Sequence, residues 1–147
     1  MIGSLLSAAC SEPMEENQLP EKNGYVGILS VIEIGDELFE QSGILADYVL
    51  DVAASRVDIY LHEVSFSSQM PVKISTVILP GVACTNEDGV LHVYDTDIVP
   101  MMEVRGERVP YDRYLCTDIR GTVTAGAISL TMKLGGFRTD YRGVAAE

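Results

Sequence analysis

Two histidines are the side chains best suited to acid–base or metal chemistry in this chain. His62 and His92 are the only histidines, and each shares a face of an expected strand with a tyrosine two positions away. Zinc sites are usually built from closely spaced pairs of cysteine or histidine ligands, and neither histidine belongs to such a pair. We therefore predict solvated surface histidines and no metal site.

Two aspartates with a spacing of two residues form the next candidate group. In a strand, Asp95 and Asp97 point to the same face, and their like charges favour a cation or an arginine between them. A dedicated calcium site would need an acidic loop containing glycine, which is missing around these residues. The sequence favours an ion pair with a neighbouring strand.

A mixed-charge segment follows between residues 103 and 120. Arginine forks bind carboxylates or phosphates, but the interspersed acids favour mutual pairing, and exposed pairs of this kind contribute little stability. The charged residues of this segment are Glu103, Arg105, Glu107, Arg108, Asp112, Arg113, Asp118 and Arg120.

Aromatic side chains leave two uses open. The chain has seven tyrosines and no tryptophan. Tyrosine is common in strands, and it is also favoured at protein interfaces and can stack on sugars.

Enzyme signatures are missing from the sequence. It contains no Gly-x-Ser-x-Gly motif and no phosphate-binding loop, and His62-Glu63 lacks the second histidine of a His-Glu-x-x-His motif. We predict a non-enzymatic protein with no catalytic residue and no cofactor.

Composition limits the partners further. The 147 residues include 22 acidic and 10 basic side chains, for a net charge of −12, and only Lys22, Lys73 and Lys133 supply ammonium groups. Nucleic acid requires a basic footprint, so the balance argues against it. The length fits one domain, and no apolar run reaches the ~18 residues of a membrane-spanning helix.

The N-terminus resembles an export signal followed by a lipid attachment site. Residues 1–10 are uncharged, and Cys10 follows the small residues Ser7, Ala8 and Ala9, as in the bacterial lipobox. Ser7 stands where that motif usually has leucine, and the basic start of a signal peptide is missing. We predict export, removal of residues 1–9 and lipidation at Cys10, which would tether the protein to the cell envelope as an outer-membrane lipoprotein. An unprocessed N-terminus is the alternative.

Residues 11–23 form an acidic stretch with two prolines and little apolar periodicity. This composition predicts a flexible tether between the anchor and the folded domain, and it fits a plain disordered tail equally well.

From residue 24 onward the apolar residues recur with a period close to two, which is typical of β-strands. Turn residues separate the runs, and no long helical stretch intervenes, so we expect an all-β sandwich or barrel. Apolar parity changes within 56–66, which predicts a β-bulge near Glu63. A helical turn or a wide hairpin loop is expected at 36–43. The expected strands are 24–33, 44–52, 56–66, 71–79, 89–99, 103–109, 113–124 and 127–134, with a closing segment at 137–143.

The body of the chain resembles the calycin-like β-barrel domain of exported and lipid-anchored proteins of gut bacteria. Four stretches carry the resemblance: GYVGILSV (24–31), MPV (70–72) leading into VILPGV (77–82), NEDGVL (86–91), and IRGTV (119–123) followed by ISLTM (128–132). The resemblance implies that residues 24–147 form an eight-stranded antiparallel up-and-down barrel, exported and tethered by a lipid near the N-terminus. Calycins as a class often hold a small apolar ligand in the barrel.

Two functions follow from such a barrel, whose interior can hold either one ligand or packed side chains. The leading hypothesis is a pocket for a small, largely apolar molecule. The alternative is a filled barrel that binds a protein or glycan at the cell surface through its loops or a tyrosine-bearing face. By parity, the side chains expected to line the interior are Val57, Ile59, Leu61, Ile128, Leu130, Met132 and Leu134.

Two cysteines remain after Cys10. Export would permit a disulfide between Cys84 and Cys116. Both lie in or near apolar β runs, however, and we favour free buried thiols.

Overall fold

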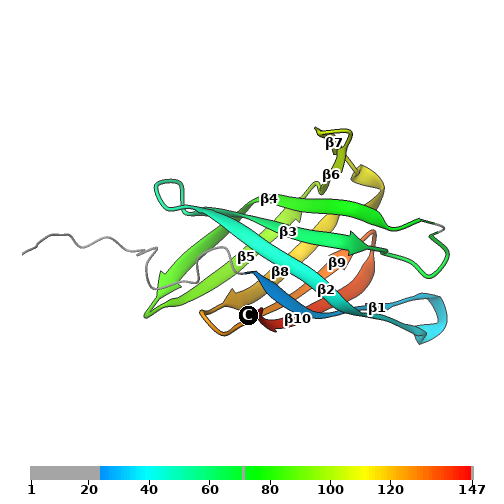
Figure 1. Cartoon of the computed structure of the whole chain (residues 1–147), viewed down its shortest axis with the longest axis horizontal. Helices are drawn as coiled ribbons and strands as arrows, with labels where there is room; N and C mark the ends of the chain where they lie inside the picture. The colour runs from blue at the N-terminus through cyan, green and yellow to red at the C-terminus, as the bar shows by residue number, and fades with distance from the viewer. Residues whose placement is uncertain (1–23, 71, 147) are drawn as a thin grey trace, which may run out of the picture.

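The computed structural model describes residues 24–70 and 72–146 (Figure 1). The predicted signal remnant (1–10), its lipidation site at Cys10 and the predicted tether (11–23) lie outside the described residues. In the part of the chain that is described, no helix is long and apolar enough to cross a membrane.

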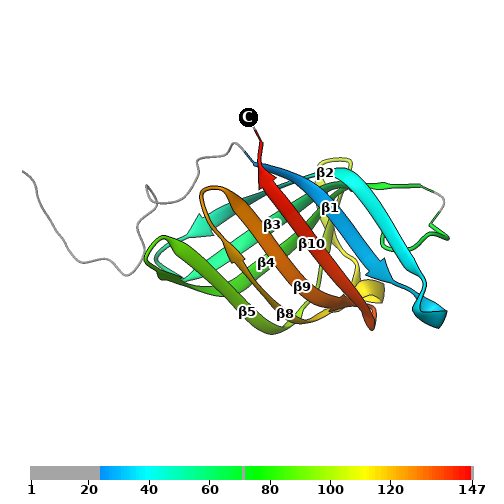
Figure 2. The same cartoon turned by 90° about the horizontal axis from the view of Figure 1, so that it is seen from below.

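Eight strands form a closed, antiparallel, up-and-down barrel, as predicted (Figures 1 and 2). Each strand pairs with the next barrel strand along the chain, and β10 pairs back with β1 to close the wall. A direct β3–β4 pairing completes the ring. The barrel strands are β1 (Tyr25–Ile32), β2 (Leu38–Asp51), β3 (Arg56–Val64), β4 (Ile74–Glu87), β5 (Val90–Ile98), β8 (Cys116–Val123), β9 (Ala127–Leu134) and β10 (Phe137–Ala145).

Strict alternation of apolar and polar residues decides which face of a strand points inward. In β3 the alternation is interrupted at Glu63, whose φ of +55° is left-handed, and the next residue, Val64, is fully buried. The buried side chains of β3 therefore change parity at Glu63, as predicted. The shift of register against β4 lies elsewhere, between Val57 and Ile59.

The expected barrel strand at 103–109 is wrong. The segment forms a separate hairpin of β6 (Met101–Val104) and β7 (Glu107–Pro110), inserted between β5 and β8. Its turn residues Arg105 and Gly106 have φ values of +52° and +80°, the conformation of a tight two-residue hairpin turn. The eighth barrel strand is instead β10, which extends the predicted closing segment at 137–143.

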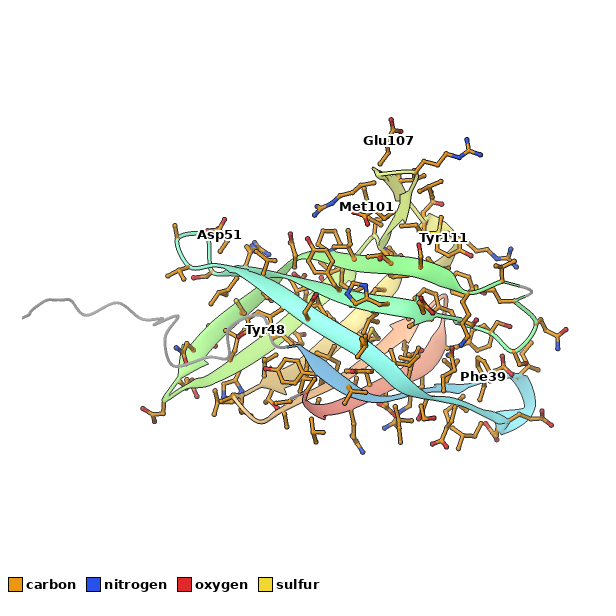
Figure 3. The ribbon with its side chains drawn as sticks, in the orientation of Figure 1. Phe39, Tyr48, Asp51, Met101, Glu107 and Tyr111 are labelled. Atoms are coloured by element: carbon orange, nitrogen blue, oxygen red, sulfur yellow. The ribbon has the colours of Figure 1, made fainter. Side chains whose placement is uncertain are left out.

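The hairpin is attached to the outer edge of the barrel wall. Met101 and Met102 of β6 pair with Ile78 and Val77 of β4, beside the part of β4 that pairs with β5. Figure 3 shows Glu107 near the tip of the hairpin, pointing away from the barrel.

Three other boundaries differ from the sequence-based expectation. At 36–43, a short 3₁₀ turn (Ile34–Asp36) is followed at once by β2, because residues 38–46 pair with β1. β4 continues through Pro80 and Gly81 to Glu87, well beyond the expected 71–79. A second 3₁₀ turn (Asp112–Tyr114) delays the start of β8.

Candidate functional site

The barrel interior is filled with packed side chains. The seven residues expected to line a ligand pocket all lie in the hydrophobic core, together with the larger rings of Tyr25, Phe66 and Tyr141. A void that could hold a water molecule would leave accessible surface on the side chains around it. The exposed fractions of these seven are only 0–2%: Val57, Ile59, Leu61, Ile128, Leu130, Met132 and Leu134. A ligand could enter among them only by displacing them.

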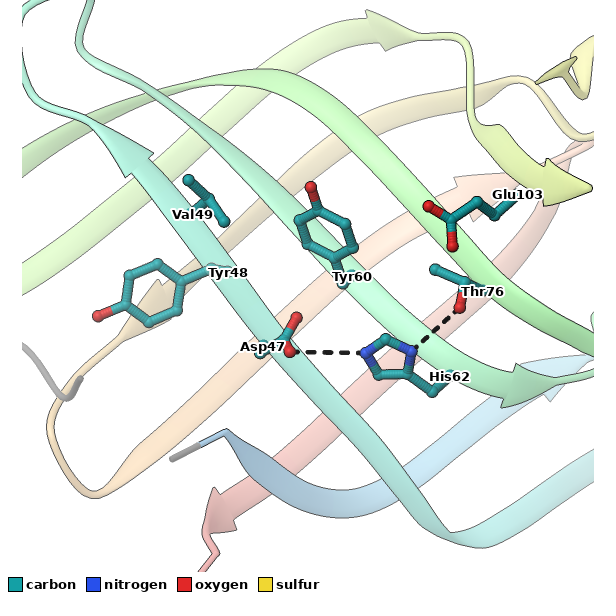
Figure 4. A pocket seen from close by; sticks show the side chains of 7 residues that line it. All are labelled: Asp47, Tyr48, Val49, Tyr60, His62, Thr76 and Glu103. Carbon is teal, nitrogen blue, oxygen red and sulfur yellow. Dashed lines mark hydrogen bonds and ion pairs between the residues drawn. The ribbon is translucent and has the colours of Figure 1, made fainter. Parts of the chain in front are cut away.

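A hollow lies instead on the outer wall of the barrel, where β2, β3 and β4 meet the β6–β7 hairpin (Figure 4). Its volume is about 260 Å³. That is below the ~300 Å³ of the smallest typical ligand pockets, so the space suits one side chain or one sugar unit. We call it the outer hollow, and it is lined by Asp47, Tyr48, Val49, Tyr60, His62, Thr76 and Glu103.

Strand register brings the polar residues of the outer hollow together. Asp47 of β2 is the cross-strand partner of Tyr60 in β3, and His62 of β3 is the partner of Thr76 in β4. Glu103 comes from β6, next to the residue that pairs with β4. The four barrel residues have outward parity, so their side chains lie over adjacent strands on one face.

His62 is held between two oxygen atoms. Its Nε2 lies 3.6 Å from Oδ2 of Asp47, and its Nδ1 shares a hydrogen bond of 3.3 Å with Oγ1 of Thr76 (Figure 4). The rings of His62 and Tyr60 are stacked, with centroids 6.4 Å apart and planes inclined by 17°. The two rings therefore lie nearly parallel to each other along β3.

Asp47, His62 and Thr76 form a partly exposed polar group on the outer face. The residue types are those of an acid–base relay, whose working contacts are ~2.6–3.2 Å long when substrate is bound. Both contacts of His62 are longer, and the side chains of His62 and Asp47 are 31% and 45% exposed. These groups can exchange hydrogen bonds with a partner that covers them.

Carboxylates dominate the electrostatics of the outer hollow. Asp47 lies on one side of Tyr60 and Glu103 on the other (Figure 4). One guanidinium group is nearby, because Arg108 of the hairpin donates a hydrogen bond of 2.8 Å to the hydroxyl of Tyr60. That bond fixes the phenol and leaves the face of its ring for other contacts.

The other residues singled out in the sequence lie away from the outer hollow. His92 is exposed on β5, 3.7 Å from Glu87. Asp95 forms an ion pair, at 3.4 Å from Arg56, but the arginine belongs to β3, beyond the neighbouring strand β4, and Asp95 also accepts the amide of Ala83. In the described residues no group of three or more histidine, cysteine or acidic side chains is placed to hold a metal ion.

The prediction that charged residues of the segment 103–120 pair with one another is wrong for three of its arginines. Arg120 of β8 lies over the ring of Tyr94, which is its direct cross-strand partner in β5. Arg113 lies over Tyr114, and Arg108 bonds to Tyr60. Only Arg120 has a tyrosine as its cross-strand partner, whereas Arg108 lies opposite Glu103 in the hairpin and Arg113 precedes Tyr114 in a 3₁₀ turn. In all three cases the contact observed is a cation–π or hydroxyl contact with a tyrosine.

Cys84 and Cys116 are free and buried, as we favoured. Their cross-strand partners in β5, Val93 and Ile98, are five positions apart, a separation of about 16 Å along the strand. Disulfides need Cα atoms within ~7 Å, so the fold keeps the two thiols apart. Burial raises the pKa of both thiols, that of Cys116 to about 12.

Comparison of the chain with family models, with curated proteins and with solved structures finds no match. The barrel agrees with the fold implied by the calycin-like resemblance, and membership of that family stays a prediction.

Sequence reasoning missed most of the outer hollow. Asp47, Tyr48, Val49 and Thr76 belong to no motif, and each is unremarkable within its own strand. The available signal was outward parity beside Tyr60 and His62. Which outward residues of neighbouring strands lie side by side depends on strand register, which the local pattern does not specify.

Proposed function

We propose that this chain is a non-enzymatic binding module that holds a protein or glycan partner on the tyrosine-bearing outer face of its barrel, at the outer hollow. The observation that carries the proposal is that the solvent-accessible hollow lies on the outer wall of the barrel and not among the interior side chains. The interior side chains have almost no accessible surface, whereas the hollow opens to solvent beside Tyr60 and Val49.

The chemistry of the outer hollow supports recognition of this kind. Tyrosine combines a large apolar ring with a polar hydroxyl, which favours it at interfaces. Asp47, His62, Thr76 and Glu103 surround the rings with hydrogen-bonding groups that can fix the orientation of a partner. A small apolar molecule would leave these polar groups without partners, which costs binding free energy.

We also propose that the module acts outside the cytoplasm, held to the cell envelope by a lipid on Cys10. The intact mass of native protein isolated from membranes tests this. A mass corresponding to a chain that begins at a diacylated Cys10 is expected, and an unmodified chain that begins at Met1 would refute the anchor.

Two variants test the binding face. The full chain, Tyr60→Ala and Tyr94→Ala are each screened against a glycan array and a displayed peptide library. Tyr94 is a matched control because it also lies exposed on the outer wall, but on β5. We expect ligands that bind the unaltered chain and Tyr94→Ala but not Tyr60→Ala. Ligands that bind all three proteins equally would contradict the proposal, provided that circular dichroism shows each variant to be folded.

A further inference from the structure

We infer that the partner is a protein and that it places a cationic side chain, lysine or arginine, in the outer hollow between Asp47 and Glu103. The inference rests on the proposed function and adds the chemistry of the partner.

Charge is the first observation that favours a cation. Asp47 and Glu103 face the hollow from β2 and β6, on either side of Tyr60 (Figure 4). The whole chain carries a net charge of −12, so a basic partner is also attracted at longer range. An ammonium or guanidinium group in the hollow is attracted by both carboxylates and can lie against the ring of Tyr60, and both interactions are favourable.

The charged groups around the hollow leave a negative balance. Besides Asp47 and Glu103, Asp58 lies on the same face of β3 and accepts the amide of Gly81. The opposing charges are Arg108, which is the cross-strand partner of Glu103 and bonds to the hydroxyl of Tyr60, and Arg56 on the same face of β3, which is paired with Asp95. His62 adds a positive charge only when it is protonated.

Size agrees with a single side chain. A hollow of about 260 Å³ can take the end of one long side chain, whose apolar stem would lie against Val49 and the ring of Tyr60. The rest of the partner must then lie outside the hollow, on the surrounding wall.

That surrounding wall is apolar, which favours a protein over a glycan. Leu45 is the cross-strand partner of His62 at the edge of the hollow, and through Val26 it continues to Val144 in β10. Exposed aliphatic side chains beside charged and aromatic anchors are typical of protein interfaces, and a hydroxyl-rich glycan gains little from them. We call these exposed side chains the aliphatic patch: Ile28, Leu45, Val49 and Val144, with exposed fractions of 45–60%.

The test is a two-dimensional NMR titration of the full chain with three probes. The first is a tetrapeptide of alternating lysine and leucine, the second is the same peptide with glutamine in place of lysine, and the third is maltohexaose. We expect only the lysine peptide to shift the amide signals of the hollow and of the aliphatic patch, with an affinity that falls as salt is added.

Charge-matched variants separate the hollow from the general acidity of the chain. Asp47→Asn with Glu103→Gln should weaken binding of the lysine peptide about tenfold, as expected for the loss of two exposed charge contacts. Glu37→Gln with Asp97→Asn removes the same charge at exposed positions elsewhere and should change the affinity less than about twofold. Arg108→Gln should strengthen binding, because it removes an opposing charge.

Equal weakening by the two double variants would overturn the inference, since only overall charge would then matter. Shifts of the hollow by maltohexaose and not by the lysine peptide would also overturn it, while leaving the proposed binding face intact. No shift of the hollow by any probe overturns the cation site. The proposed function fails separately, through unchanged binding by Tyr60→Ala in the screens.

Discussion

The hydroxyl of Tyr141 donates a hydrogen bond of 2.8 Å to the carbonyl oxygen of Ile44, although β1 lies between their two strands. The ring of Tyr141 passes over Gly143, where a Cβ atom would come within 2.8 Å of the hydroxyl oxygen. Gly143, Gly27 and Ile44 are successive partners across β10, β1 and β2. One buried side chain therefore connects three strands where the first and last strands of the barrel meet.

Loss of this hydroxyl should destabilise the barrel. Tyr141→Phe keeps the ring but removes the donor to Ile44, and we expect the free energy of unfolding to fall by about 1–2 kcal/mol. Urea denaturation at pH 7 measures the change. An unchanged midpoint and slope would mean that the bond contributes nothing to the closure of the barrel.

The same residue should make the protein sensitive to alkali. Burial raises the pKa of Tyr141 to about 12 in the folded chain, whereas an unfolded tyrosine titrates near ~10. The folded state therefore holds this proton more tightly, and its stabilising effect is complete below pH ~10 and is lost as the pH rises towards 12. Because Tyr141→Phe cannot undergo this loss, its stability deficit relative to the unaltered chain should narrow at pH 11. A deficit that stays constant between pH 7 and 11 would contradict the shift.

Gly27 should tolerate no side chain. A Cβ atom there would lie 2.0 Å from the carbonyl oxygen of Arg142 and 2.4 Å from Cα of Gly143, so the backbones of β1 and β10 would have to separate. We expect Gly27→Ala to cost more than about 3 kcal/mol or to prevent folding. Gly126→Ala is the matched control, because no atom lies within 4 Å of its added Cβ. It should change stability by less than about 0.5 kcal/mol in thermal or urea melts, and similar losses at both positions would refute the close approach.

Removal of the β6–β7 hairpin should spare the barrel and weaken binding at the outer hollow. The amide of Tyr111 donates a 2.8 Å hydrogen bond to the carbonyl of Pro100, so residues 101–110 can be replaced by two glycines without moving the ends. Ile78, which is fully buried although it points outward, loses its cover, at a cost of about 1.5–3 kcal/mol. Binding of the lysine peptide should fall because Glu103 is gone.

The control for that deletion keeps the hairpin and changes only its turn. Arg105 has a left-handed φ that asparagine adopts readily, so Arg105→Asn should retain both stability and peptide binding. Full peptide binding by the deletion variant would show that the hairpin forms no wall of the site.

Neither buried thiol should react in the folded protein. Burial raises the pKa of Cys84 and Cys116, which leaves little thiolate at pH 8, and both side chains are shielded. Alkylation with iodoacetamide followed by mass spectrometry should label them only after unfolding. A mass lower by two daltons that disappears on reduction would reveal a disulfide and contradict the separation of β4 and β8 across β5.

The apolar and polar alternation within each strand was predictable, because one face of the strand is buried and successive side chains point to opposite faces. Ile128, Leu130, Met132 and Leu134 alternate with polar residues, and all four lie in the core. The hairpin was not predictable in the same way. Arg105-Gly106 is a turn signal in the middle of residues 101–110, but the segment has the length of one strand, and its attachment to Ile78 depends on a neighbour more than 20 positions away.

The outer hollow depends even more on distant pairing. Asp47, Tyr60 and Thr76 come from three strands, and their alignment follows from the β2–β3 and β3–β4 registers. A shift of one residue in either ladder would turn the side chains of that strand to the other face. Tyr60 and His62 were recognisable from their types, but the residues opposite them were not.

Methyl-labelled NMR of the full chain gives the most direct test of whether binding takes place outside the filled barrel. The lysine peptide and, separately, a long-chain fatty acid are titrated while the methyl signals of Leu61 and Met132 in the core and of Leu45 and Val49 at the hollow are followed. We predict saturable shifts of Leu45 and Val49 with the peptide and no saturable shift of Leu61 or Met132 with the fatty acid. Saturable shifts of Leu61 and Met132 with the fatty acid, together with unmoved Leu45 and Val49 signals with the peptide, would contradict the filled barrel and place the ligand inside.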